Sequence, residues 1–195
     1  MIEARGSRPA LVRAYNMFSV LYGLPGARLE REGVNRGLKR TGVRAGERVL
    51  EVAVGTGLVH ARLRSRLGST GLLVGVDLSP GMLRVTRRQV PEARLARADA
   101  RQLPFPAETF DVLYAGYFLD LIPTRELVPL LGEFRRVLRR GGRLVVVNFS
   151  KNGEPLTWWE RAYQVTPTFL VPWLFAGCRP VQAEPSVRAA GFAEV

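Results

Sequence analysis

The chain has 195 residues, of which 47% are hydrophobic, so it is long and apolar enough for one domain with a buried core and too apolar for a disordered chain. Its single cysteine excludes a disulfide framework and a cysteine-rich zinc site, and it is compatible with a cytoplasmic protein. The net charge of +12 is spread along the chain without a basic tail, so nucleic-acid binding gains no specific support.

Helical and strand patterns alternate along most of the chain. Apolar spacing predicts helices over 8–40, interrupted near residues 23–26. In chain order we then expect a strand at 48–53, a helix at 57–67, a strand at 72–77, a helix from Ser79-Pro80, strands at 93–97 and 110–115, a helix at 125–139 ending at Gly141-Gly142, and a strand at 143–149. This order predicts an α/β fold with a doubly wound, mostly parallel, Rossmann-like sheet and helices on both faces.

The first predicted strand leads into a turn with few side chains, Ala53-Val54-Gly55-Thr56-Gly57, and Asp77 ends the next strand. Such a turn lets backbone N–H groups approach a ligand, and a carboxylate on the neighbouring strand can hold two ribose hydroxyls. Together they predict a nucleoside-containing cofactor at the carboxyl edge of a parallel sheet. His60 stands where a dinucleotide fingerprint needs its third glycine, which argues against an NAD enzyme.

Five segments, in order, resemble the motifs of class I S-adenosylmethionine-dependent methyltransferases. They are Glu51 to Gly57, Gly75 to Leu83, Arg97 to Pro106, Phe110 to Pro123 and Leu138 to Leu144. Ala53 departs from the commonest form of the first motif and looks like the ubiquinone/menaquinone-biosynthesis C-methyltransferases and their relatives. Gly177 to Val181 is similar to bacterial phospholipid N-methyltransferase relatives.

The resemblance implies S-adenosylmethionine as the cofactor. It implies that Glu51 orients the amino group of the methionine part and that Asp77 accepts from the ribose hydroxyls. It also implies further cofactor contacts from Ala53, Gly55, Thr56, Gly57, Leu78, Met82, Asp99, Ala100 and Ala115. Two alternatives stay open, because Asp77 could be a helix N-terminal acid and Glu51 a buried structural acid.

Methyl transfer is an in-line displacement, so positioning can supply much of the catalysis. Asp120 and Tyr117 are the candidate catalytic residues, because they follow the fourth strand where many relatives carry histidine. Asp120 could equally be an N-cap or pair with Arg125, and Tyr117 could pack in the core. His60, the one histidine, is expected to be a surface or packing residue.

Residues 151–176 depart from the alternation and are rich in aromatic residues and proline, which predicts either a substrate cap or ordinary core packing. We expect one domain over 1–195, with a helical segment at 1–45, a cofactor-binding core at 46–150 and an aromatic cap at 151–182. The cap favours a small or lipid-like acceptor, such as a quinone precursor or a phospholipid head group. The basic charge would then favour contact with an anionic membrane.

Other classes are weighed by what the chain carries. Ala115 to Phe118 lacks the Asn/Asp-Pro-Pro-Tyr/Phe motif of nucleic-acid amino methylation, and Cys178 lies far along the chain from the site that base C5 methylation requires. A lone thiol also argues against arsenite methylation. A cofactor-binding partner subunit without catalysis and an RNA methyltransferase remain as alternatives.

Gly191-Phe192 resembles the start of the family's sixth strand, and the antiparallel strand that normally follows is missing or truncated. We therefore expect a sheet edge that is open to a partner or to oligomer formation.

Overall fold

A five-stranded parallel sheet forms the centre of the molecule. The computed structural model describes residues 2–19, 26–150 and 157–193. Its strands are β1 (Arg48–Val52), β2 (Leu72–Asp77), β3 (Arg94–Arg97), β4 (Phe110–Gly116) and β5 (Leu138–Val147). Their order is β3-β2-β1-β4-β5, and every neighbouring pair is parallel, which confirms the predicted fold class. The strand order reverses between β1 and β4, where open α/β sheets bind ligands at the carboxyl ends.

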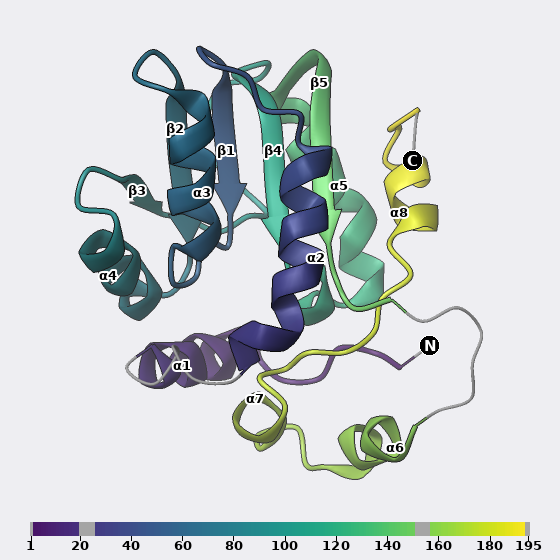
Figure 1. Cartoon of the computed structure of the whole chain (residues 1–195). Helices are drawn as coiled ribbons and strands as arrows, with labels where there is room; N and C mark the ends of the chain where they lie inside the picture. The colour runs from purple at the N-terminus through teal and green to yellow at the C-terminus, as the bar shows by residue number, and fades with distance from the viewer. Residues whose placement is uncertain (1, 20–25, 151–156, 194–195) are drawn as a thin grey trace.

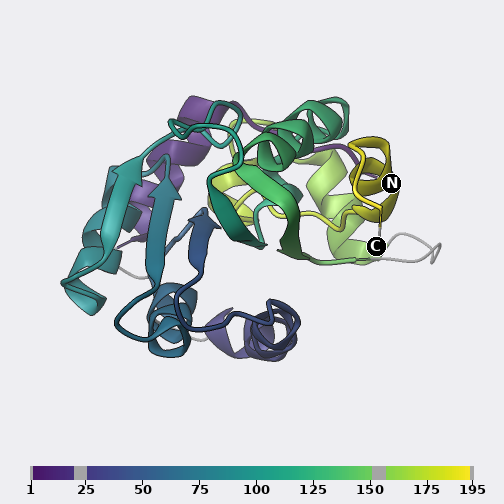
Figure 2. The ribbon, with the colours of Figure 1, turned by 90° about the horizontal axis from the view of Figure 1, so that it is seen from above.

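Helices cover both faces of the sheet (Figures 1 and 2). The helices are α1 (Arg8–Phe18), α2 (Gly26–Arg40), α3 (Leu58–Leu67), α4 (Pro80–Gln89), α5 (Thr124–Val137), α6 (Trp158–Val165), α7 (Val171–Leu174) and α8 (Glu184–Ala189), with a 3-10 turn at Leu119–Leu121. Helices α2 and α3 lie on one face, and α5 lies on the other. None of the helices in the described part of the chain is long and apolar enough to cross a membrane.

Alternation of side chains along the central strands builds a separate core on each face. Val49 of β1 and Val112 of β4 pack with α2 and α3, whereas Leu50 and Leu113, the next residues, pack with α5. All four side chains are fully buried. Because successive strand residues point to opposite faces, a continuous apolar run buries both faces of a parallel sheet.

The structure corrects the predicted boundary between α5 and β5. The helix ends at Val137, and the strand begins at Leu138 rather than at residue 143. The ladder is irregular here, since Phe110 pairs with Leu138 and Val112 with Arg143. The Gly141-Gly142 turn expected before the strand therefore lies inside this irregular part of the strand, where Gly141 takes a left-handed conformation at φ +70°.

The predicted sixth strand is also absent from the described residues. Gly191 follows α8 in a turn, and Phe192 packs against the core on the α5 face.

Buried Arg179 joins the two ends of the described chain. It donates to the carbonyl oxygens of Ile2 at 3.1 Å and Ile122 at 2.7 Å, and to Thr124 Oγ1 at 3.3 Å. Ile2 also packs with Tyr163 and Val171 in a small core beneath the sheet. These contacts hold the N-terminal segment against the region of α6 and α7.

Candidate active site

A cavity of about 770 Å³ opens at the carboxyl ends of β1, β2 and β4. Its wall combines the turn after β1, the end of β2, the segments after β3 and β4, and one side of α1. Ligand sites of enzymes usually measure about 300–1,000 Å³, so this one has room for a nucleoside cofactor with a small acceptor.

The predicted glycine turn and Asp77 meet in this cavity. Gly55 N–H donates to Asp77 Oδ2 at 3.0 Å, and Ser79 N–H donates to Oδ1 at 2.8 Å. Burial raises the pKa of Asp77, while these two hydrogen bonds and one from Leu78 oppose the rise. The carboxylate is therefore fixed by backbone donors and still lines the cavity, and it keeps lone pairs that can accept further hydrogen bonds. The bond from Ser79, the N-cap of α4, also agrees with the alternative that Asp77 is an acid at a helix N-terminus.

Backbone conformation keeps the turn narrow. Ala53 has φ +56°, a left-handed conformation that is unusual for a residue with a Cβ. Gly57 has φ +85°, and a Cβ there would lie 2.8 Å from Thr86 Cγ2 of α4. Thr86 Oγ1 in turn donates to the Gly55 carbonyl at 2.7 Å. Close packing against α4 thus holds the turn, and it explains why Gly57 is required although it does not line the cavity.

Glu51 and His60 form a buried pair behind the turn. His60 Nδ1 lies 2.8 Å from Glu51 Oε2, and the two residues are 1% and 2% exposed. Burial raises the pKa of Glu51, and the contact with His60 opposes that rise. Glu51 lines the cavity as expected, whereas His60 packs behind it, in contact distance of the Gly75 position on β2. From the sequence, His60 was expected to be a surface or packing residue. Its partner was missed, because the pair depends on how α3 packs on the sheet.

Most predicted cofactor contacts reach the cavity, and three predicted residues do not. The residues brought together in its wall are Glu51, Ala53, Gly55, Thr56, Asp77, Leu78, Met82, Asp99, Ala100 and Tyr117. Ala115 is fully buried in the α5-face core, and neighbouring Gly116 lines the cavity in its place. Gly57 packs on α4, and Asp120 is enclosed.

The placement of Asp120 does not fit the expected catalytic role. The side chain is 0% exposed and does not line the cavity. Its charge acts on buried Arg179, whose pKa it helps to raise against the lowering effect of burial. Arg125, the expected partner, instead approaches Glu126 at 3.8 Å. A general base must reach the proton it removes, and an enclosed carboxylate that does not line the cavity is poorly placed to do so.

Tyr117 remains a candidate at the reacting end. It lines the cavity, and its backbone has φ +49°, a strained conformation for an aromatic residue. Its N–H donates to the Val147 carbonyl at 2.6 Å, and its ring lies 4.9 Å from that of Phe149. Tyr114 of β4 lines the cavity as well, although its side chain is only 1% exposed.

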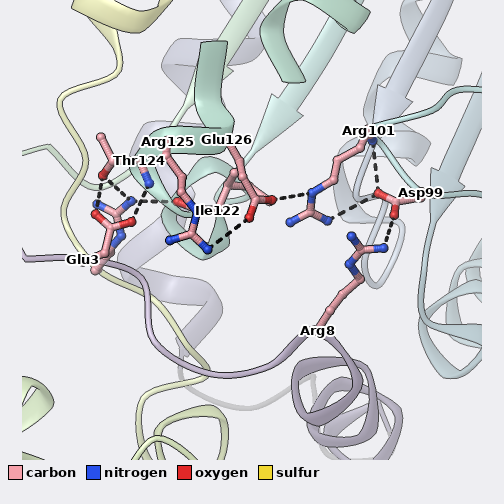
Figure 3. A network of polar contacts seen from close by, with 9 residues as sticks. Glu3, Arg8, Asp99, Arg101, Ile122, Thr124, Arg125 and Glu126 are labelled. Atoms are coloured by element: carbon pink, nitrogen blue, oxygen red, sulfur yellow. Dashed lines mark hydrogen bonds and ion pairs between the residues drawn. The ribbon is translucent and has the colours of Figure 1, made fainter. Parts of the chain in front are cut away.

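A polar network closes the side of the cavity near Asp99 (Figure 3). Asp99 accepts from Arg8 of α1 at 2.6 Å and lies 3.5 Å from Arg101. Arg101 also donates to Glu126 of α5 at 2.8 Å. Arg125 extends it by approaching Glu126 at 3.8 Å, and Thr124 and Glu3 are joined nearby by hydrogen bonds of 2.7 and 2.6 Å. The Asp99 carboxylate, which was expected to contact the adenine, therefore already contacts two arginines.

Sequence reasoning did not foresee the contribution of α1. Leu11, Val12 and Tyr15 line the cavity, as does Arg8. Asn16 fastens this helix to α4, because its Oδ1 accepts from Gly81 N–H at 2.8 Å and from Ser79 Oγ at 2.7 Å. Polar residues at the start of α4 and an amphipathic α1 were the available signals, but neither specifies which surfaces meet.

The aromatic cap is not confirmed as a cover for the site. Between residues 157 and 182 of the described chain, Cys178 lines the cavity and the aromatic side chains do not. Tyr163 and Phe175 pack with each other, with ring centroids 5.4 Å apart, in the core beneath the sheet. Ordinary packing explains these two rings. The expectation that Cys178 is remote was wrong, since sequence separation says little about distance in the fold.

Comparisons with known proteins agree with the geometry. A family model described as a methyltransferase domain matches residues 49–142. The ubiquinone/menaquinone biosynthesis C-methyltransferase UbiE of Cupriavidus taiwanensis is 35% identical over 155 residues, which are 77% of this chain and 61% of that protein. The chain thus spans about three fifths of the length of this curated relative.

Solved structures share the fold. A SAM-dependent methyltransferase from Aquifex aeolicus superposes with a TM-score of 0.63 at 19% identity, covering 90% of this chain and 87% of that one. Phosphoethanolamine N-methyltransferase 2 of Haemonchus contortus, solved in complex with S-adenosyl-L-methionine, gives a TM-score of 0.67 at 23% identity, covering 83% and 36%. At these identities the likeness concerns the fold.

Proposed function

Because residues 49–142 of this chain belong to the methyltransferase-domain family, we propose that the protein transfers a methyl group from S-adenosylmethionine to a small or lipid-like acceptor. The observation that carries the proposal is the Asp77 carboxylate at the cavity wall, held by the N–H groups of Gly55 and Ser79. The match to UbiE supports a quinone precursor as the acceptor and carbon as the methylated atom.

The residues present fit the adenosyl and methionine parts of this cofactor. Asp77 has acceptor capacity left for ribose hydroxyls. Gly55 has no side chain, so a ligand can come close to the backbone of the turn there. Glu51 presents a buried carboxylate of the right charge for an ammonium group. Bound cofactor would supply an electrophilic methyl group on a sulfonium, whose leaving group departs neutral.

What the chain itself contributes is mostly positioning. Asp77 and Glu51 bind two distant ends of one molecule, and each is fixed by its own partners, Gly55 and Ser79 for Asp77 and His60 for Glu51. A site held in this way would bind the cofactor without rearrangement and leave its methyl group open to the acceptor. Tyr117 at the cavity wall is placed to orient an acceptor by hydrogen bonding. In this scheme Asp120 does not act as the general base that removes a proton from the acceptor.

A lipid-like acceptor would also bring the protein to a membrane surface, which agrees with the net charge of +12. A non-catalytic partner subunit is the second candidate carried from the sequence, but no feature of the cavity favours it. Methyl transfer by this chain alone from labelled cofactor to quinone precursors would dismiss that alternative.

Calorimetric titration with S-adenosylmethionine tests the cofactor site. We expect Asp77→Ala to weaken binding about 10- to 100-fold, because hydrogen bonds to a charged group contribute about 1.5–3 kcal/mol. Glu184→Gln, at an acid 62% exposed on α8, is the control and should bind like the parent protein. Equal affinity of Asp77→Ala and parent, with both folded, would remove the ribose assignment.

A further inference from the structure

Large apolar side chains are exposed on α6, on α7 and on the turn between them, beneath the sheet. Trp158 is 81% exposed, Val165 82%, Phe169 67% and Leu174 65%. Tryptophan and phenylalanine are rarely so exposed together in a monomeric soluble domain, and a cluster of this kind marks an interaction surface. We call these four residues, with Met17 of α1, the lower apolar surface.

The geometry of α6 places its apolar residues on the side away from the core. Trp158 and Val165 are two helical turns apart and so share one face, on which Arg161 also lies. Glu160 and Tyr163, on the opposite side, are buried. The burial of that side fixes how the helix is rotated, so the apolar face points outward.

Helix α1 continues the same surface. Phe18 contacts Trp173 of α7 with ring centroids 5.9 Å apart, and Met17 beside it is 56% exposed. Figure 1 shows α1, α7 and α6 along the same lower side of the molecule, away from the sheet. Helices separated by most of the chain therefore lie along one side of the molecule, and each of them carries an exposed apolar side chain.

The charges that accompany this surface are positive. Arg13 and Arg161 are exposed on α1 and α6. Glu160, the acid of α6, is 2% exposed, and its carboxylate accepts from the backbone N–H and the hydroxyl of Thr157, both at 2.7 Å. Helices α1 and α7 carry no acidic residue. Aromatic and aliphatic side chains flanked by arginine are typical of segments that lie in an anionic membrane interface.

We propose that the lower apolar surface docks the protein on an anionic lipid bilayer and that the acceptor is an amphiphile taken from that bilayer. The second part rests on the proposed function. Leu11 and Val12 of α1 line the cavity, and so does Cys178, which follows α7. The elements that carry the surface thus also form the cavity wall. Docking places that wall next to the bilayer, where an amphiphile can pass between the two without entering bulk water.

Vesicle co-sedimentation tests the docking. The whole chain should bind phosphatidylglycerol vesicles at least 10-fold more tightly than phosphatidylcholine vesicles, and binding should weaken as salt rises. The double variant Trp158→Ser/Phe169→Ser should lose at least 10-fold in affinity for phosphatidylglycerol. The double variant Arg13→Gln/Arg161→Gln should lose most of the preference for anionic lipid. Val128→Ser, at a side chain 40% exposed on α5, is the control and should bind normally.

Three results would overturn the proposal. They are no binding to either vesicle at low salt, unchanged binding of Trp158→Ser/Phe169→Ser, and a lipid-free dimer that disappears in that variant. The last result, seen by sedimentation velocity, would assign the surface to a second copy of this chain. Calorimetry with S-adenosylmethionine on the same samples shows that the variants are folded. It also separates the docking proposal from the proposed methyl transfer. If the parent protein binds S-adenosylmethionine but no vesicles, the docking is wrong and the proposed function still stands.

Discussion

At the residue scale, the contact with His60 favours the charged form of the buried Glu51 carboxylate at the cavity wall. The two side chains are almost fully enclosed, and their ring-to-carboxylate contact is 2.8 Å. Removing one partner of a buried pair usually lowers stability by more than the pair itself contributes, because the other group is left buried without an opposite charge. His60 thus acts as a positioning residue for Glu51.

Replacement of His60 tests that role. His60→Ala should lower the free energy of unfolding by about 3 kcal/mol, the usual cost of breaking a buried pair. It should also raise the Kd for S-adenosylmethionine, since an isolated buried carboxylate becomes protonated more readily. Denaturant unfolding and calorimetry measure the two effects. A double-mutant cycle with Glu51→Gln should show strong coupling, and additive effects would contradict the pairing.

Asp77 predicts a pH dependence of cofactor binding. Burial raises its pKa, so the carboxylate becomes protonated at a higher pH than an ordinary aspartate. The affinity for S-adenosylmethionine should fall as pH is lowered through that raised pKa, because the protonated group has lost acceptor capacity. In Asp77→Asn the affinity should be weaker at neutral pH, and its loss on acidification should be smaller, which calorimetry at a series of pH values measures.

The same raised pKa has an opposite effect on folding. Between the unfolded and folded pKa values the native state binds more protons at Asp77, so this group's contribution to stability is lost as pH rises through that window. Asp77→Asn should remove this part of the pH dependence of unfolding. An unchanged pH profile of both unfolding and binding would contradict the assigned pKa shift.

At the element scale, α2 lies unusually close to the sheet. A Cβ at Gly37 would come within 2.3 Å of Val147 Cγ2 and 3.2 Å of Tyr114 Cε2. Gly33, one turn earlier, stands against the hydroxyl of Tyr117. The helix therefore supports from behind two tyrosines that line the cavity, and its distance from the sheet sets their positions.

Replacement of Gly37 by alanine tests this close packing, and the same replacement at Gly132 of α5 is the control. Gly37→Ala should destabilise the protein by about 1–3 kcal/mol through overpacking. Gly132→Ala on α5, where nothing lies within 4 Å of the added Cβ, should stabilise it by about 0.5–1 kcal/mol. Thermal or denaturant unfolding measures both. Equal effects of the two changes would contradict the close packing of α2.

The elements also show what sequence reasoning can reach. Strands β1 to β4 and helices α3 to α5 are predicted to within a few residues, because local apolar spacing and the proline at Pro80 encode them. The start of β5 was missed, since the irregular pairing of Leu138 with β4 depends on contacts between the two strands. Asp77 and the glycine turn are local signals, whereas the contacts of Arg8, His60 and Cys178 arise from packing between distant segments.

At the scale of the whole molecule, Arg179 and the N-terminal segment tie the helices beneath the sheet to the cavity wall. Arg179 is 0% exposed, and its partners Ile2, Ile122 and Thr124 come from separate segments. The sequence marked this arginine within a short resemblance but gave no sign of its burial. Its position ties the segment after α7 to the N-terminal segment and to the start of α5.

Arg179 can be tested by its effect on the whole fold. Arg179→Met should lower the free energy of unfolding by about 3–5 kcal/mol, because buried Asp120 and two carbonyl groups lose their charged partner. Arg125→Met, at a side chain 79% exposed, should change stability by less than about 1 kcal/mol. Denaturant titration compares them, and similar small effects would contradict the central role of Arg179.

The most direct test of the central claim is a crystal structure of the chain with S-adenosylhomocysteine, the demethylated product of the cofactor. The adenosyl group should lie in the cavity after β1 and β2, with both ribose hydroxyls within hydrogen-bond distance of the Asp77 carboxylate. Its amino group should point toward Glu51. A ligand bound elsewhere, or a cavity in which Asp77 makes no contact with the ribose, would contradict the account.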